Sequence, residues 1–385
     1  MNNASRREVQ RAGPTRGTSE AQSTTPPATA GAPGEPKKTE QMATREVHLD
    51  QWVDPAVADE RGQLRAGQIL ECMDVVGVLA ATRHSRRPVV TVSVDGMDLR
   101  ESVRVGERVT MTATVGFTSD KSIGICVSMV AGFAGENERR CFDGYMTFVA
   151  LDAEGRPNVV PQLSPETPAE VVRFREGQLR REFRRKLAAG ELPAASTLAT
   201  VNDENLPLFI RELLKVLPLS FRLPRDPHVK PRRRHASYMH SIELARTGHL
   251  NFHGTLYGGT LMRWLENTAS LSARAHVGGA TVRMSGLHGL NFIRPVPANS
   301  FVHVRSEVVH ASCEAMTVLV NVQSEDPLTG ALSDTVRAFV SYLPVDPPSV
   351  RVPPVERTND EDRALYEEVE HRLALQRIIG DGTAP

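Results

Sequence analysis

A long internal duplication constrains the fold of this 385-residue chain more than any other feature of its sequence. Three landmarks recur at one offset of 192 residues, as the pairs Gly62 and Gly254, Gly67 and Gly259, and Asp74 and Glu266. Only two long copies exist, which distinguishes the pattern from the many short repeats of a solenoid. Each copy is therefore expected to form one structural unit of the same kind.

Each copy begins with a glycine turn that opens a helix. Within residues 62–81, apolar side chains recur at helical spacing, and Asp74 lies on or beside the apolar face. The second copy repeats this order within residues 254–273, and Phe148 is matched to Phe339 further along the copies. Strand-like runs follow each helix, at residues 91–99, 107–117, 122–130 and 143–151 in copy one and 285–296, 300–311, 314–323 and 333–345 in copy two. One helix followed by several antiparallel strands predicts an α+β unit whose sheet wraps around the helix.

Changes in composition divide the chain into five predicted parts. They are a disordered N-terminal tail (1–44), a first domain (45–153), a linker with helices (154–230), a second domain (231–347) and a C-terminal tail with a helix (348–385). The first part is rich in Ser, Thr, Pro, Gly and Ala, so it has too little apolar surface to offset the entropy of ordering. In the linker, residues 171–187 and 206–217 are helix candidates, whereas residues 361–378 fit either a helix or a frayed surface tail.

Charge and cysteine content exclude several classes of function. Forty-six basic and 46 acidic side chains cancel, so no global field attracts nucleic acid or an anionic membrane, and the basic run at 230–235 is interpreted as a solvated lead into a strand. Four cysteines match no metal or haem spacing, and no stretch is long and apolar enough to span a bilayer. We expect a soluble cytoplasmic protein without a metal. Mitochondrial import is the alternative, since the N-terminal tail carries four arginines and many hydroxyl residues.

Several ordered motifs resemble those of one protein family. They are the glycine turn and acidic helix, Arg83-His84 before a strand, FTSDKS at 117–122, YMTFVALD at 145–152 and GRPNVVPQLSPETPAE at 155–170. Together they resemble the tandem hotdog acyl-CoA thioesterases, and most closely the branch of the cytosolic acetyl-CoA hydrolase and the brown-fat-inducible thioesterase. The resemblance covers residues 45–347 and implies two hotdog domains that form an intramolecular pseudo-dimer. Relatives often carry a START domain next, but only 38 residues follow here, so none is expected.

The resemblance implies hydrolysis of fatty acyl-CoA to a free fatty acid and coenzyme A, with no cofactor other than the coenzyme A of the substrate. A helical carboxylate, Asp74 or Glu266, would assist attack by water. The backbone N–H groups at the helix N-terminus, beside Gly67 or Gly259, would stabilise the oxyanion.

In this family each site is composite, because the helix of one domain faces the glycine loop of the other. Carried over to this chain, Asp74 would pair with Thr255, and Glu266 would pair with Gln63. The family usually has Asn at one of these loop positions, and neither copy has it, although Asn251 would compensate if its loop bends. We expect one active site and favour the one that contains Asp74.

The same resemblance assigns the coenzyme-binding residues. The stretch with Thr118, Ser119, Lys121 and Ser122 matches the nucleotide-contacting loop of the family, and a lysine there suits phosphate. Glu314 replaces Lys121 in copy two and would repel phosphate, so one competent coenzyme pocket is expected.

Two other classes of function are weighed against hydrolysis. A hotdog hydratase would pair the helical Asp with a His five residues later, but those positions hold Leu79 and Leu271. A non-catalytic acyl-CoA binding or regulatory protein is the main alternative, because the loop Asn is missing. The family resemblance also implies a homo-oligomer, a trimer of double-hotdog chains.

Overall fold

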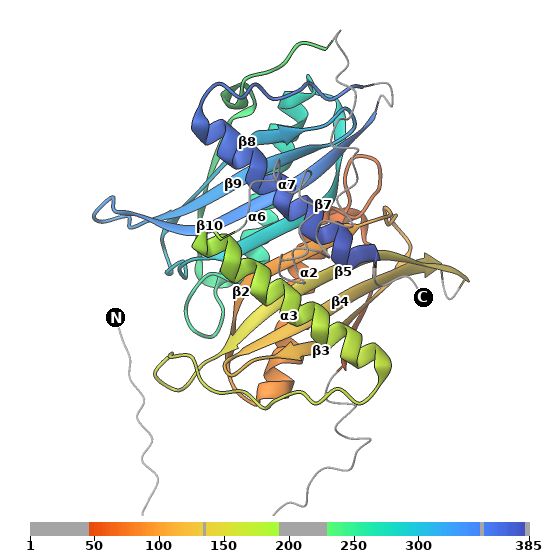
Figure 1. Ribbon diagram of the computed structural model, residues 1–385, viewed down its shortest axis with the longest axis vertical. Coiled ribbons are helices and arrows are strands. Elements are labelled where there is room, and N and C mark those ends of the chain that lie inside the picture. The colour runs from red at the N-terminus through yellow and green to blue at the C-terminus, as the bar shows by residue number, and fades with distance from the viewer. Residues whose placement is uncertain (1–45, 134–135, 192–228, 347–349, 382–385) are drawn as a thin grey trace, which may run out of the picture.

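The computed structural model describes residues 46–133, 136–191, 229–346 and 350–381. Ten strands of the described chain form one antiparallel sheet in the order β1-β3-β4-β5-β2-β7-β10-β9-β8-β6 (Figure 1). The strands are β1 (Glu46–Trp52), β2 (Val89–Leu99), β3 (Arg108–Thr118), β4 (Ser122–Phe133), β5 (Glu136–Ala150), β6 (Met239–Leu244), β7 (Thr281–Phe292), β8 (Phe301–Ala311), β9 (Met316–Glu325) and β10 (Leu332–Asp346). The sequence runs predicted all of these except the two edge strands β1 and β6.

The two copies meet at the centre of this sheet, where β2 pairs with β7. Val94 pairs with Leu290, and Met97 pairs with Leu287. In these strands equivalent residues of the two copies are 193 positions apart, so the two pairs are related by symmetry. Outward from this seam, the strand order of one half repeats that of the other. The duplication therefore folds as an intramolecular pseudo-dimer, as the sequence predicted.

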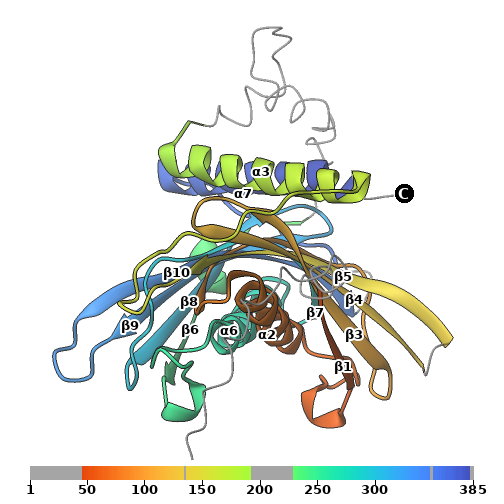
Figure 2. The ribbon, with the colours of Figure 1, turned by 90° about the horizontal axis from the view of Figure 1, so that it is seen from below.

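Four helices cover the two faces of the sheet in layers. The central helices α2 (Ala66–Ser85) and α6 (Gly258–His276) lie side by side within the concave face (Figure 2). The outer helices α3 (Pro168–Ala189) and α7 (Asp360–Asp381) cover the opposite face. The expected arrangement of a long helix wrapped by an antiparallel sheet is confirmed for both copies.

The apolar stripe of α2 fixes this helix against its sheet. Leu70, Met73 and Val76 are fully buried, which removes their apolar surface from water. At Gly77 a Cβ atom would lie 2.8 Å from Cζ of Phe148, so only glycine lets the helix approach the sheet this closely. Asp74, between these residues, is consequently buried as well.

The outer helices are held to the sheet differently. On α3, which begins with a capping box formed by Thr167 and Glu170, the Arg180 guanidinium lies 3.3 Å from the centre of the Tyr145 ring. On α7, Leu365 and Val369 pack with the fully buried Phe339, so the candidate at 361–378 is a helix that is packed against the sheet over its described side chains rather than a frayed tail. The helix candidate at 206–217 and the N-terminal tail lie outside the described residues.

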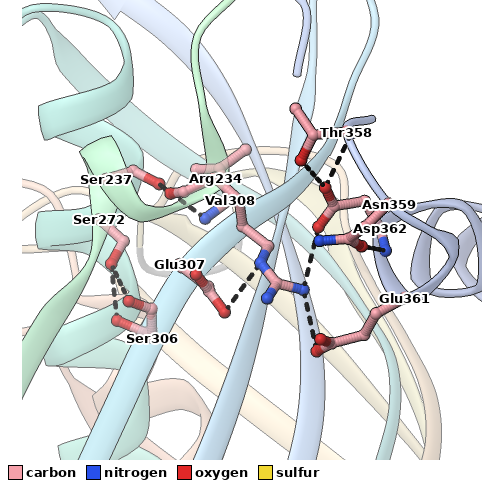
Figure 3. A network of polar contacts seen from close by, with 10 residues as sticks. All are labelled: Arg234, Ser237, Ser272, Ser306, Glu307, Val308, Thr358, Asn359, Glu361 and Asp362. Carbon is pink, nitrogen blue, oxygen red and sulfur yellow. Dashed lines mark hydrogen bonds and ion pairs between the residues drawn. The ribbon is translucent and has the colours of Figure 1, made fainter. Parts of the chain in front are cut away.

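Arg234 ties the start of α7 to the second domain. Its guanidinium lies 3.3 Å from Glu307 on β8, 3.2 Å from Glu361 and 3.4 Å from Asp362 on α7 (Figure 3). Only 20% of its side chain is exposed, so these ion pairs are partly screened from water. The interpretation of the basic run at 230–235 as a solvated lead is therefore wrong for Arg234, which links three carboxylates.

Strand register corrects one sequence match. Phe148 pairs with Thr91 beyond a bulge in β2, and Tyr342 pairs with Met284 beyond the corresponding bulge in β7. Tyr342 is thus the counterpart of Phe148. Phe339 instead packs beneath α7, on the face of the sheet away from the central helices.

Candidate active site

Asp74 lies where α2 passes the N-terminus of α6. One carboxylate oxygen accepts a hydrogen bond from the Thr91 hydroxyl on β2 at 2.7 Å, and the other accepts one from the Gly259 backbone N–H at 2.7 Å. The side chain is only 1% exposed. Residues of both domains thus hold a single buried carboxylate in place.

The glycines at the start of α6 permit this contact. A Cβ atom on Gly259 would lie 3.0 Å from the Glu71 Cα and 3.2 Å from the Asp74 Cβ. No side chain of its own caps α6, so Asp74 acts as the cap from the other domain. The family resemblance implied a carboxylate that faces the glycine turn of the other copy, and the structure brings Asp74 and Gly259 together in that way.

Burial tunes the acidity of this carboxylate. It raises the pKa of Asp74 from its usual value of 3.8 to about 6, despite the opposing hydrogen bonds from Thr91 and Gly259. The carboxylate is therefore ionised at neutral pH and is a stronger base than an exposed aspartate. A base with a pKa close to the working pH is well suited to proton transfer.

A second composite site surrounds Glu266 on α6. Its carboxylate accepts a hydrogen bond from the Tyr342 hydroxyl at 3.2 Å and another from the Gly67 backbone N–H of α2. Burial raises the pKa of Glu266 to about 7, and Tyr342 is itself fully buried. Each acid therefore caps the helix of the opposite domain.

The two sites differ in the side chains beside the acid. Met284 stands on β7 where Thr91 stands on β2, because the bulges of the two strands are equivalent. The hydroxyl partner of Glu266 comes instead from Tyr342, at the position that Phe148 occupies in copy one. In copy one the acid therefore bonds to a small hydroxyl from β2. In copy two the acid bonds to a large phenol from β10.

The glycine loops hold their polar residues away from the acids. Asn251 accepts backbone hydrogen bonds from His253 and Thr255, and its amide donates to the Thr255 hydroxyl at 3.0 Å. In the other loop, Gln63 accepts from Arg61 at 2.8 Å and donates its backbone N–H to Asp59.

The expected side-chain pairs are consequently not formed. Within the described part of the chain, Thr255 has no hydrogen bond to Asp74, and Gln63 has none to Glu266. Both loops close on themselves through an Asx turn, which uses their polar groups internally. Asn251 takes the same place in its loop as Asp59 does in the first, and so is the loop amide on the Asp74 side.

Thr91 is the functional candidate that the sequence did not reveal. It follows Asp74 by 17 residues and is one of two hydroxyl residues in a strand-like run. The only available signal was its place near the start of the strand after the acidic helix. Its contact with Asp74 depends on the bulge at Val92, which no sequence pattern announces.

The turn predicted to bind coenzyme A lies at the same end of the sheet as Asp74. Ser122 pairs with Val149, which pairs with Val90, next to Thr91, so the turn is two strands or about 10 Å away. Within the turn, the Thr118 hydroxyl accepts from the Leu163 N–H at 2.8 Å, which ties the linker to it.

The remaining side chains of this turn differ in their freedom. The hydroxyls of Ser119 and Ser122 lie 2.6 Å apart, whereas Lys121 is exposed. Lys121 is therefore an exposed cation of this turn, next to the exposed carboxylate of Asp120. Among the described residues no group of acids, histidines or cysteines is arranged to hold a metal ion, and no described helix is long and apolar enough to cross a membrane.

Comparison with known proteins identifies the domain type. Residues 64–132 and 253–331 both match the family model of the Thioesterase superfamily. The rat acetyl-coenzyme A thioesterase is 31% identical over 60% of this chain, and the mouse cytosolic acyl coenzyme A thioester hydrolase is 34% identical over 37% of it. This chain spans only 38% of the length of either relative. A Bacillus cereus acyl-CoA hydrolase structure, 31% identical, covers 42% of this chain and 98% of its own, with a TM-score of 0.37.

The two matches coincide with the two copies. Each begins in the loop before a central helix and ends in or just beyond the third strand after that helix. Both copies therefore match this superfamily model, and the continuous sheet with its paired central helices is that of a tandem hotdog fold.

Proposed function

We propose that this protein hydrolyses acyl-CoA thioesters to a free fatty acid and coenzyme A, and that Asp74 is the catalytic base. The observation that carries the proposal is a buried carboxylate with a pKa of about 6, oriented by Thr91 and by the N-terminus of α6. The substrate class follows from the relatives, which are named for acetyl-CoA and acyl-CoA thioesters.

The reaction needs one proton to move twice. Asp74 takes a proton from water as the water oxygen bonds to the thioester carbon, and a tetrahedral oxyanion forms. The carbon–sulfur bond then breaks, and the thiolate leaves with the proton that Asp74 returns. The products are a carboxylic acid and a thiol, so atoms and charge balance.

Donors at the start of α6 would stabilise the oxyanion. The Gly259 N–H is already bonded to Asp74, so it is not free to bind the oxyanion. The N–H groups of Gly258 and Thr260 lie in the same first turn, which a helix leaves without carbonyl partners of its own. We assign the oxyanion to these two groups and to the positive end of the helix dipole.

The remaining predicted residues form part of the same proposal. Thr255 and Asn251 would line the mouth of the Asp74 site from the opposite loop. Lys121 would contact the phosphates of coenzyme A, and its exposure on a turn at the same sheet end supports this role. Glu314, exposed at the equivalent turn of copy two, carries the opposite charge.

We assign hydrolysis to one of the two sites. Glu266 is covered by the Tyr342 phenol and has Met284 in place of a threonine, which supports a non-hydrolytic role for this site. The proposed division of the chain is an N-terminal tail (1–44), two domains (45–153 and 231–347), the linker between them (154–230) and a C-terminal tail (348–385). A cytoplasmic location agrees with the name of the mouse cytosolic relative, and assembly as a trimer rests on the family resemblance alone.

A survey of thiol release tests the proposed function. The full chain is mixed with acyl-CoA substrates from acetyl to palmitoyl, and free thiol is measured over time. Saturable release that depends on acyl length is expected. A protein that binds coenzyme A by calorimetry but releases no thiol from any substrate would instead be the non-catalytic binding protein.

A further inference from the structure

An arginine-lined pocket of about 480 Å³ lies at the end of the copy-one strands, away from Asp74. Four guanidinium groups line it, from Arg100, Arg104, Arg139 and Arg283, together with the carboxylates of Glu101 and Glu107. Gln63 also lines the pocket, and its backbone forms an isolated antiparallel β-bridge with that of Arg104. Because Gln63 is four residues before Gly67, the pocket adjoins the loop that leads to the Glu266 site.

Two of the four arginines are neutralised locally. Arg139 lies 2.7 Å from both Glu101 and Glu107. Arg100 lies 3.1 Å from Asp98 and 3.0 Å from Asp143. Neither of these groups therefore needs a further anion.

The other two keep their positive charge. Among the described residues, neither Arg104 nor Arg283 has a carboxylate within ion-pair distance, although the exposed Arg104 is close enough to Glu107 to help lower the pKa of that carboxyl. Arg283 is partly buried, and its Nη1 donates to the backbone oxygen of Leu99 at 3.0 Å. Burial and the nearby Arg61 lower the pKa of Arg283, and the smaller effect of Asp98 opposes them, so on balance its environment disfavours the positive charge. An anion in the pocket would relieve that repulsion.

The pocket belongs to one copy only. Strand register gives the counterparts of its arginines in the other half of the molecule, where Arg100, Arg104, Arg139 and Arg283 correspond to Ile293, Pro297, Ser333 and Val90. None of the four counterparts is charged. The hotdog fold therefore does not require these arginines, since its second copy forms the same strands without them.

We propose that this pocket binds a phosphate-bearing anion, held by Arg104 and Arg283. Guanidinium groups suit phosphate because their planar N–H donors match two of its oxygens. The pocket has room for linked phosphate groups, which occur in a free polyphosphate and in the diphosphate of coenzyme A. The proposal does not depend on hydrolysis at Asp74, so it stands or fails separately from the proposed function.

Calorimetric titration with inorganic pyrophosphate tests the site in the full chain at low salt. Arg283→Gln and Arg104→Gln should each weaken binding about tenfold, the effect of losing a charge-assisted hydrogen bond. The control is Arg294→Gln, which removes an exposed arginine from the equivalent loop of copy two and should leave binding unchanged. Arg104 is exposed, so Arg104→Gln is expected to fold normally. It therefore still tests the site if Arg283→Gln fails to fold.

Coenzyme A added to the pyrophosphate complex distinguishes the two sources of phosphate. Displacement of pyrophosphate would assign the pocket to the phosphates of the coenzyme, and continued binding would assign it to a free anion. The proposal is overturned if pyrophosphate fails to saturate the wild type. Equal affinity for the wild type and both pocket variants would overturn it as well.

Discussion

Arg263 and Glu71 occupy equivalent positions of the two copies, yet the Arg263 Nε lies 3.0 Å from a carboxylate oxygen of Glu71. The pair joins α6 to α2 beside the pseudo-two-fold axis. If either domain paired with a second copy of itself, like charges would meet at this point. The divergence of these two residues therefore favours pairing between different domains within one chain.

Charge reversal tests this pairing. Glu71→Arg and Arg263→Glu should each destabilise the protein, because each places like charges at the helix contact. The double variant should recover about 1 kcal/mol through the inverted pair, since the groups are partly exposed. Urea unfolding measures all four proteins. Strictly additive effects of the two substitutions would show that the pair contributes nothing.

Removing the Thr91 hydroxyl should shift the pH dependence of hydrolysis. Activity requires ionised Asp74, so kcat/KM should rise with pH through a midpoint near 6. The hydrogen bond from Thr91 lowers this pKa, so Thr91→Val should move the midpoint to higher pH. Thr91→Ser keeps the hydroxyl and serves as the control. An unchanged midpoint in the valine variant would separate Thr91 from the ionisation of the base.

Glu266 should make folding stability depend on pH. Its folded pKa of about 7 exceeds the usual 4.5, so the folded protein favours the protonated acid, and stability falls as pH rises from about 4.5 to 7. Glu266→Gln removes this dependence. It should be more stable than wild type at pH 8, by on the order of 3 kcal/mol, with no such gain below pH 4.5. Urea unfolding at pH 4 and pH 8 measures the difference in stability between the variant and the wild type. A gain in stability of equal size at both pH values would contradict a raised pKa of Glu266.

A methyl group at the start of α6 should damage the active site. In Gly259→Ala the Cβ would meet the Glu71 backbone at 3.0 Å, so the helices must separate near Asp74. Activity should fall about a hundredfold, because small displacements disturb catalytic geometry. Gly67→Ala crowds Arg263 at 3.1 Å at the other end of the helix pair and is the matched control. Comparable losses of kcat in both variants would indicate a general packing defect.

The sequence predicted the parts of this fold that recur with a simple period. The duplication, both central helices and eight of the ten described strands follow from glycine spacing and apolar patterns. The edge strand β1 was missed because it lies before its helix, outside the predicted runs, and β6 was expected only as an undefined strand after the basic run at 230–235. Each instead completes an edge of the sheet by pairing with β3 or β8.

Site geometry depends on details that a pattern does not carry. The contact of Asp74 with Thr91 requires a bulge at Val92, and the contact of Glu266 with Tyr342 depends on the equivalent bulge at Ser285. A shift of one residue changes which side chains face the central helix. For the same reason the match of Phe148 to Phe339 failed. Family resemblance located the acids and the facing helix, but not the hydroxyls beside them.

The most direct test compares two isosteric variants, Asp74→Asn and Glu266→Gln, in the thiol-release assay with the best acyl-CoA substrate. Loss of the base should lower kcat of Asp74→Asn by about 10²- to 10⁴-fold, while Glu266→Gln keeps nearly wild-type kcat. Thermal melting of both variants confirms that they are folded at the assay temperature. Full activity in Asp74→Asn, or a loss confined to Glu266→Gln, would contradict the assignment of hydrolysis to the Asp74 site.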